Sequence, residues 1–266
     1  MDARFAASSG SRVYVEDAGA GIPVLALHGL GGGAYFFSGL SARLSRHCRV
    51  VSVDLPGTGR STPTLEAMSP NRWMADLGEL VRETIGAPVV ILGHSLGAML
   101  ALKAWEVWPA WIRAMVLVGG LPKVRPEIHE RLSERAQVVK AQGLVGLGPQ
   151  VAAANLSPET MDRQPERAAL FARVFETQRP DVYLRGIEIL CELSMESVPA
   201  TLGVPVLAVA GRDDFYAPPD LVRAFMCQVP AGRTEVLPAC GHLPFLEAPE
   251  AFATIVRAFV ADLEPA

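Results

Sequence analysis

The stretch that decides the fold runs Val89-Val90-Ile91-Leu92-Gly93-His94-Ser95-Leu96-Gly97-Ala98. Its first four residues are apolar without polar alternation, which is typical of a strand buried on both faces. The next five residues read G-x-S-x-G, and an apolar helix pattern follows over Ala98–Val107. A strand, a sharp turn with two glycines and a helix would lift the Ser95 hydroxyl above the edge of a sheet, so the stretch predicts a nucleophile.

Similar short apolar runs recur on both sides of this stretch. They are Val24–Leu27, Val50–Val53, Met115–Val118 and Val204–Ala210. Helix patterns lie between many of them, such as the one that opens at Ser69-Pro70 and closes at Gly86. This alternation predicts an α/β fold with a mostly parallel central sheet flanked by helices. Arg12–Asp17 alternates polar and apolar residues instead, so we expect an antiparallel edge strand there.

The stretch from 122 to 197 breaks this rhythm because it has no buried strand pattern. It predicts helices at Glu127–Gln142, Pro165–Gln178 and Asp181–Ser194, with a short turn near Ser157. We therefore expect two units. Residues 1–121 and 198–266 form an α/β core, and residues 122–197 form a helical cap inserted into it.

A serine nucleophile needs a base, and only two histidines follow Ser95 in the chain. His129 lies among charged residues of a predicted helix, which favours a solvated face. His242 lies between a glycine and a leucine-proline pair, in a loop after the expected strand Thr234–Leu237. That loop lies at the end of the last strand, where the base is required, so His242 is the predicted base.

The base in turn needs an orienting acid, which in this chain order comes between the serine and the histidine. Asp213 and Asp214 both follow the apolar run Val204–Ala210. One of them is expected only to shape an Asp-rich turn. The spacing within Gly211–Pro218 favours Asp214 as the acid.

The oxyanion of an acyl-transfer reaction needs two backbone N–H donors. The glycine-rich loop His28–Gly33 follows the strand Val24–Leu27 and predicts one donor at Leu30. The residue after the serine, Leu96, supplies the other. His28 is expected to hold the loop rather than to catalyse.

Bulky side chains lie beside these loops in the sequence and are the candidates for a largely apolar substrate pocket. They are Phe36, Phe37, Phe215, Tyr216 and Leu243. No pair of cations is evident beside them. A clamp for an acidic substrate would have to come from cap arginines such as Arg125, Arg163 or Arg173.

A rival interpretation begins at Gly29–Ala34, which fits the G-x-G-x-x-A fingerprint of an NAD-dependent Rossmann dehydrogenase. Asp54 follows about 20 residues later, as a ribose-binding acid would. The bulky run Tyr35–Phe37 opposes close helix–strand packing, and no Tyr is followed four residues later by Lys. We therefore expect Asp54 to anchor a turn.

Composition and charge indicate which partners and metal sites to expect. The net charge is −4 and there is no basic block or stripe, so nucleic acid is not an expected partner. The four cysteines form no C-x-x-C pair, which disfavours a zinc site and favours reduced thiols. No apolar run is long enough to span a membrane, and the first ten residues lack the apolar segment of a signal peptide. We expect a cytoplasmic protein with no membrane partner, metal or cofactor.

Five motifs taken together resemble the α/β-hydrolase superfamily: His28-Gly29, Asp54–Ser61, Gly93–Gly97, Gly211–Pro218 and Gly241-His242. The resemblance lies in the capped esterase, lactonase and C–C hydrolase branch, and the chain is loosely similar to the 3-oxoadipate enol-lactonases. It implies a triad of Ser95, Asp214 and His242, with residues from about 122 to 197 as the cap.

The residues and the resemblance together predict a serine hydrolase that cleaves a small to medium, mostly apolar carboxylic ester or lactone through an acyl-enzyme. A C–C bond hydrolase acting on a vinylogous diketone uses the same triad and stays open as an alternative. A non-catalytic ligand-binding protein on the same fold is a second alternative. The sequence leaves the oligomeric state unknown.

Overall fold

A computed structural model describes residues 1–7, 11–61 and 64–263 of the chain. The described residues form one eight-stranded sheet in the order β1-β2-β4-β3-β5-β6-β7-β8. The strands are β1 (Asp2–Ala7), β2 (Arg12–Ala18), β3 (Pro23–Leu27), β4 (Arg49–Val53), β5 (Val89–His94), β6 (Ile112–Val118), β7 (Val206–Gly211) and β8 (Gly232–Leu237). From β4 to β8 in that order all neighbours pair in parallel, which confirms the predicted class of fold.

The strand predicted at Arg12–Asp17 is present as β2 and is antiparallel to both neighbours, but its predicted edge position is wrong, because β2 lies inside the sheet. β1 pairs antiparallel with its outer side, from Asp2 opposite Asp17 to Ala7 opposite Arg12, and β4 pairs with its inner side. The Asp17 carboxylate accepts hydrogen bonds from Arg4 at 2.7 Å and from Arg49 at 2.8 Å, one from each neighbouring strand. Polar residues of β2 thus find partners within the sheet, so polar alternation did not require an edge.

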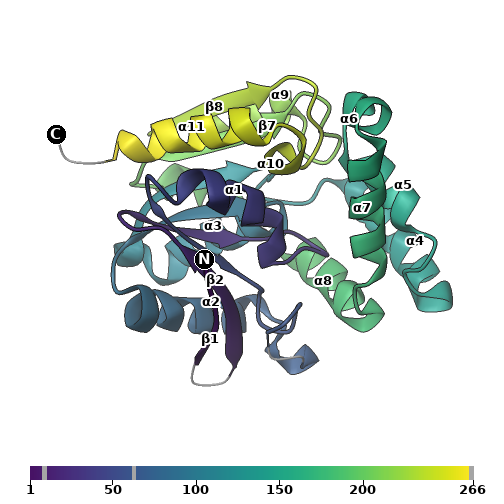
Figure 1. Ribbon diagram of the computed structural model, residues 1–266, viewed down its shortest axis with the longest axis horizontal. Helices are drawn as coiled ribbons and strands as arrows, with labels where there is room; N and C mark the ends of the chain where they lie inside the picture. Colours follow the sequence, from purple (N-terminus) through teal and green to yellow (C-terminus); the bar gives the residue numbers. More distant parts are fainter. Residues whose placement is uncertain (8–10, 62–63, 264–266) are drawn as a thin grey trace.

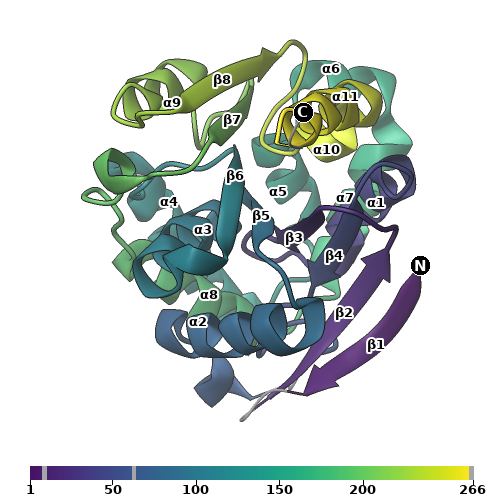
Figure 2. The same ribbon diagram turned by 90° about the vertical axis from the view of Figure 1, so that its left-hand side faces the viewer.

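Helices cover both faces of the sheet (Figure 2). One face carries α2 (Pro70–Glu79), α3 (Leu96–Val107) and α9 (Pro219–Met226), and the other carries α1 (Ser38–Leu44), α10 (Pro244–Glu247) and α11 (Pro249–Ala261). In β3 the side chains of Leu25 and Leu27 enter the first layer, whereas Val24 and Ala26 enter the second. This period of two explains why the strand is apolar throughout.

The helix expected after Ser69 begins as predicted, because the Ser69 hydroxyl accepts a hydrogen bond from the Arg72 N–H at 3.2 Å. It continues beyond α2 as one π-helical segment and ends at Gly86, which has the left-handed φ of 75°. That π-helical segment is Leu80–Ile85. Short helical segments occur elsewhere at Ala34–Phe37, Leu65–Ala67, Pro109–Trp111 and Pro199–Thr201. β7 begins two residues later than predicted because Pro205 has no N–H for the ladder.

Five α-helices lie between β6 and β7. They are α4 (Pro126–Gln142), α5 (Gly148–Asn155), α6 (Pro158–Arg163), α7 (Pro165–Glu176) and α8 (Pro180–Glu192). In Figure 1, α4 to α7 stand together at the right, beyond one end of the sheet. None of the helices formed by the described residues is long and apolar enough to cross a membrane.

Two of these helices differ from the sequence prediction. α5 was not predicted, because it opens with Gly148-Pro149 after a glycine-rich run, and such residues usually mark loops. Its helix forms because Val151 and Ala152 are buried against neighbouring helices. α6 was expected only as a turn, and it is a short helix capped by the Ser157 hydroxyl.

Candidate active site

Ser95 stands at a strained turn between β5 and α3. Its φ of 54° and ψ of −113° lie outside the usual regions for a residue with a side chain. Its N–H donates a hydrogen bond of 2.9 Å to the carbonyl oxygen of Val118 in the neighbouring strand. Such strain costs on the order of 1–3 kcal/mol and is concentrated at functional sites. The backbone therefore holds this serine in the geometry expected of a nucleophile at a strand–helix turn.

The two motif glycines permit this turn by close approach. A Cβ on Gly97 would lie 2.1 Å from the carbonyl oxygen of Leu27 in β3. A Cβ on Gly93 would lie 2.2 Å from the carbonyl oxygen of Gly97 itself. No larger residue fits at either position, because real Cβ atoms do not approach backbone oxygens so closely.

The structure brings His242 and Asp214 together. His242 Nδ1 lies 2.9 Å from Asp214 Oδ2, and both side chains are almost fully buried. The second carboxylate oxygen, Oδ1, accepts hydrogen bonds from the N–H groups of Tyr216 at 2.8 Å and Ala217 at 3.0 Å. One oxygen is thus held by the backbone and the other orients the imidazole. Asp213 is exposed, so the geometry favours Asp214 over it.

A buried carboxylate that the sequence analysis missed anchors the loop of His242. Glu247 Oε1 accepts hydrogen bonds from the N–H of Gly241 at 2.8 Å and of Leu243 at 3.4 Å. Its Oε2 accepts one from the N–H of Ser157 at 2.7 Å. The signal was present, since Glu247 is the one acid in an apolar segment from Leu243 to Pro249.

The inserted helices also contact this loop directly. The His242 N–H donates to the carbonyl oxygen of Asn155, at the end of α5, over 2.7 Å. The Ser157 hydroxyl donates to the carbonyl oxygen of Ala239 over 2.9 Å. The position of His242 therefore depends on residues from the insertion as well as from the core.

His94 also contacts the loop that carries His242. Its Nε2 donates a hydrogen bond of 2.9 Å to the carbonyl oxygen of His242, and the two ring centroids are 4.8 Å apart. Burial lowers the pKa of His94 well below its usual value, and the nearby His242 lowers it further. His94 is therefore a neutral imidazole that fixes the backbone of His242.

The glycine-rich loop after β3 is held by His28. Its Nδ1 donates to the carbonyl oxygen of Gly29 at 2.8 Å, and its Nε2 accepts from the N–H of Leu55 at 3.1 Å. Burial lowers the pKa of His28, so it is neutral as these bonds require. The Leu30 N–H donates to no acceptor within the described part of the chain. Leu96 is the first residue of α3, so its N–H has no acceptor in the helix.

Asp54 is used entirely by the loops around it. Its Oδ1 accepts from the N–H of Ala34 at 2.7 Å, and its Oδ2 accepts from the N–H of Arg60 at 2.7 Å. The glycine loop leads into the short helical segment Ala34–Phe37, and α1 follows directly from Ser38. The dinucleotide-binding alternative is wrong, because Asp54 is engaged by these backbone donors and β5 lies beside β3 rather than beyond β4, unlike the usual dinucleotide-binding sheet.

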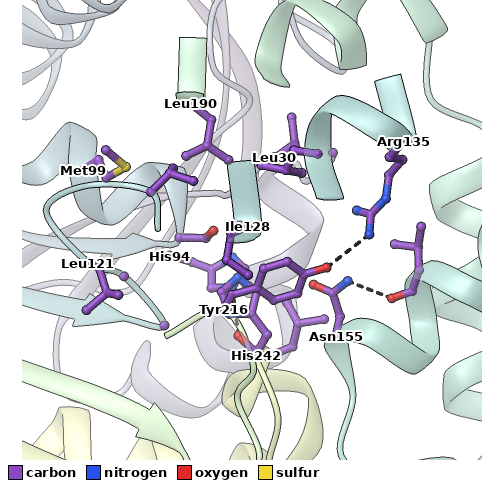
Figure 3. Close-up of a pocket in the computed structure, with 18 of the residues that line it drawn as sticks. Leu30, His94, Met99, Leu121, Ile128, Arg135, Asn155, Leu190, Tyr216 and His242 are labelled. Carbon is purple, nitrogen blue, oxygen red and sulfur yellow. Dashed lines mark hydrogen bonds between the residues drawn. The ribbon is translucent and has the colours of Figure 1, made fainter. Parts of the chain in front are cut away.

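A cavity of about 820 Å³, the open space at its mouth included, lies over Ser95 and His242 (Figure 3). Three pocket candidates line it: Phe36, Tyr216 and Leu243. Tyr216 lies against the base, with its ring centroid 4.8 Å from that of His242. Over the described residues, no group of three or more His, Cys, Asp or Glu is placed to hold a metal ion.

Two residues predicted to line the pocket, Phe37 and Phe215, do not line this cavity. Phe37 is fully buried beneath it, where its ring packs 5.3 Å from that of Phe245. Phe215 faces outward, with the guanidinium of Arg131 4.3 Å from its ring centre. The local backbone sets the direction of both side chains, because neighbouring residues in a turn or short helix point in different directions.

The cavity also contains a cation that the sequence analysis missed. Of the three arginines named from the sequence, Arg125 lines the cavity, and Arg163 and Arg173 do not. Arg135 lines it as well. Arg135 lies seven residues after the buried Ile128 of α4, on the same helix face. That spacing was the available signal.

Comparison with known proteins identifies the family of this chain. Residues 24–255 match the family described as "Alpha/beta hydrolase family". The chain is 30% identical over 250 residues to the pimeloyl-[acyl-carrier protein] methyl ester esterase of Yersinia enterocolitica, covering 88% of this chain and 91% of that protein.

Solved structures show the same fold. A thermophilic esterase from Thermogutta terrifontis superposes with a TM-score of 0.90 at 21% identity, covering 100% of both chains. The enol-lactonase from Burkholderia xenovorans LB400 superposes with a TM-score of 0.88 at 21% identity, covering 97% of this chain and 99% of that one. The expected superfamily is confirmed: the protein belongs to the alpha/beta hydrolase family.

Proposed function

We propose that this protein is a carboxylic ester hydrolase that cleaves an ester or lactone. In this proposal Ser95 is the nucleophile, His242 the base and Asp214 the orienting acid. The observation that carries it is the 2.9 Å contact between His242 and Asp214 at a cavity that a serine in a strained turn also lines. Each of the three residues follows the carboxyl end of a different strand.

The reaction follows from these roles. His242 Nε2 takes the proton of the Ser95 hydroxyl while the oxygen attacks the substrate carbonyl carbon. The N–H groups of Leu30 and Leu96 donate to the resulting oxyanion. The imidazolium returns its proton to the leaving alkoxide, which frees the alcohol and leaves an acyl-enzyme. Water then gives a proton to His242 and attacks the acyl carbon, and the imidazolium returns that proton to Ser95 Oγ as the acid is released.

The insertion is proposed to act as a cap. Helices α4 to α8 supply much of the cavity lining, including Ile128, Leu132, Phe171 and Leu190. These apolar walls support a substrate with an apolar acyl or alcohol portion of small to medium size. Ester cleavage is named in the Yersinia relative and lactone cleavage in the Burkholderia neighbour, which supports these two substrate classes.

Active-site labelling tests the proposal. The protein should take up one equivalent of a fluorophosphonate and turn over p-nitrophenyl esters of graded chain length. Ser95→Ala should abolish the label and lower kcat by about 10³-fold or more, because the residual rate comes only from binding and the oxyanion donors. Ser133→Ala removes an exposed serine of α4 and is the control.

The outcomes separate the remaining classes. Labelling that persists in Ser95→Ala would overturn the assignment of the nucleophile. Labelling with no turnover of any ester or lactone, but with turnover of a vinylogous diketone, would replace ester cleavage by C–C cleavage. Ligand-induced thermal shifts without label or turnover would identify a binding protein.

A further inference from the structure

Arg135 is a cation in the cavity wall whose contacts are all neutral. One guanidinium nitrogen donates to the Tyr183 hydroxyl and another to the Tyr216 hydroxyl, each over 3.2 Å. Burial raises the pKa of Tyr183, so this phenol is uncharged at neutral pH. No ion pair within the described part of the chain includes Arg135. A partly buried guanidinium with no anionic partner lowers the stability of the folded protein, so we expect its position to serve a function.

The Lys, Arg, Asp and Glu side chains that line the cavity are all cations. Among the described residues that line it are Lys123, Arg125 and Arg135, and none is Asp or Glu. Lys123 and Arg125 each pair at 2.9 Å with a glutamate that does not line the cavity. Arg135 is therefore the lining cation whose charge is left for a ligand. Its guanidinium has five N–H donors, of which the two tyrosines use only part.

Tyr216 connects this cation to the proposed chemistry. Its ring lies 4.8 Å from the ring of His242, and its hydroxyl accepts the hydrogen bond from Arg135. Figure 3 shows the guanidinium of Arg135 pointing at the Tyr216 hydroxyl, with His242 at the other end of the tyrosine. One tyrosine side chain therefore separates the base from the cation.

We propose that Arg135, Tyr183 and Tyr216 form a carboxylate subsite, and that the substrate is a half-ester or lactone that carries a free carboxylate. This inference rests on the proposed function and narrows it. A carboxylate matches the fork of a guanidinium and accepts hydrogen bonds from phenol hydroxyls. The apolar walls then contact the methylene chain between the two ends.

A purely structural role for Arg135 makes a different prediction. Its two hydrogen bonds join α4 to α8 and to the loop after β7, so it would act only as a brace for the insertion. Removing a brace lowers the turnover of every ester alike. Removing a carboxylate subsite lowers the turnover of charged esters selectively.

The experiment compares two esters of equal chain length, mono-p-nitrophenyl hexanedioate and p-nitrophenyl hexanoate. The measured quantity is the ratio of their kcat/KM values in wild type, Arg135→Gln, Arg135→Lys and the control Arg163→Gln. Arg163 is an exposed cap residue outside the cavity. We expect Arg135→Gln to lower the ratio on the order of 10- to 100-fold, mostly through KM, since a charged hydrogen bond is lost. Arg135→Lys should restore part of it, and Arg163→Gln should leave it unchanged.

A second measurement keeps this inference separate from the proposed function. Calorimetry should detect hexanedioate binding to wild type and about tenfold or greater weakening in Arg135→Gln. Ester turnover whose ratio does not change in Arg135→Gln overturns the subsite and leaves the ester hydrolase standing. Arg135-dependent binding of hexanedioate without turnover of either ester overturns the proposed function and leaves the subsite standing.

Discussion

At Ser95 the backbone adopts a conformation that is unfavourable for a residue with a side chain. The strain is stable because the Ser95 N–H is bonded to β6 and because the flanking glycines fit against β3 and α3. The neighbouring acid is fixed in a similar way. Two backbone N–H groups hold Asp214 Oδ1, which leaves Oδ2 free to orient the imidazole of His242.

These contacts predict unequal effects of two adjacent substitutions. Asp214→Asn should lower kcat for a p-nitrophenyl ester by about 10³- to 10⁴-fold, because an amide no longer holds the imidazole in the productive tautomer. Asp213→Asn should change kcat by less than about twofold, because Asp213 is exposed. Steady-state kinetics of the two variants check this. A larger loss of kcat in Asp213→Asn than in Asp214→Asn would show that Asp213, and not Asp214, orients the imidazole.

The residues of the proposed triad are predictable from the sequence because each follows a recognisable strand pattern. Arg135 and Glu247 are not, because their importance lies in what surrounds them. Arg135 reads as one of many helix arginines until its helix is placed over the cavity. Glu247 reads as a surface acid until three N–H groups are seen to converge on it.

The loop between β8 and α10 is the element on which the site depends most. It carries His242, and it is held by Glu247 from its own side and by the ends of α5 and α6 from the insertion. A hydrogen-bonded anchor of this kind is needed because a loop without regular structure has few bonds of its own.

Glu247→Gln should therefore destabilise the protein and slow ester turnover together. One carboxylate oxygen becomes an NH₂ group that faces an N–H donor, so a buried bond is replaced by a repulsive contact. We expect the free energy of unfolding to fall by about 1–3 kcal/mol, measured by urea denaturation.

The control for this variant is Glu250→Gln, three residues further along. The Glu250 carboxylate is largely exposed and pairs with Arg43 at the surface, so its removal should cost no more than about 0.5 kcal/mol. Equal destabilisation in the two variants would show that Glu247 does not anchor the loop.

Elements were predictable where their pattern is strong and local. The central strands and the helices α4, α7 and α8 follow directly from apolar runs, helix-start residues and glycine stops. β1 and α5 were missed because each depends on a distant partner. β1 is held by pairing with β2, and α5 packs against α7.

The whole molecule contains two buried histidines that stay neutral, His28 and His94. Burial lowers the pKa of both in the folded protein, whereas in the unfolded chain the pKa is about 6.5. Below about pH 6.5 the unfolded chain therefore binds protons that the folded protein does not. The contribution of these two histidines to the free energy of unfolding is therefore fully present above about pH 6.5 and is lost as the pH is lowered.

This linkage predicts the pH dependence of unfolding. Between about pH 6.5 and pH 5.5, the free energy of unfolding should fall by up to about 1.4 kcal/mol per pH unit for each histidine. Urea denaturation at a series of pH values measures it. His28→Asn should reduce the slope, and His129→Gln, at an exposed position, should not change it. A free energy of unfolding that is constant over this interval would contradict the prediction.

The sequence by itself determined the class of fold, the order of the central strands and of most helices along the chain, and the strand ends that carry the proposed triad. It did so because hydrophobic period, turn glycines and chain order are local properties that survive without coordinates. Only the tertiary structure decided which side chains converge. Burial and hydrogen bonding between distant segments separate Asp214 from Asp213, remove Phe37 and Phe215 from the pocket, and bring Arg135 over the same cavity as Ser95.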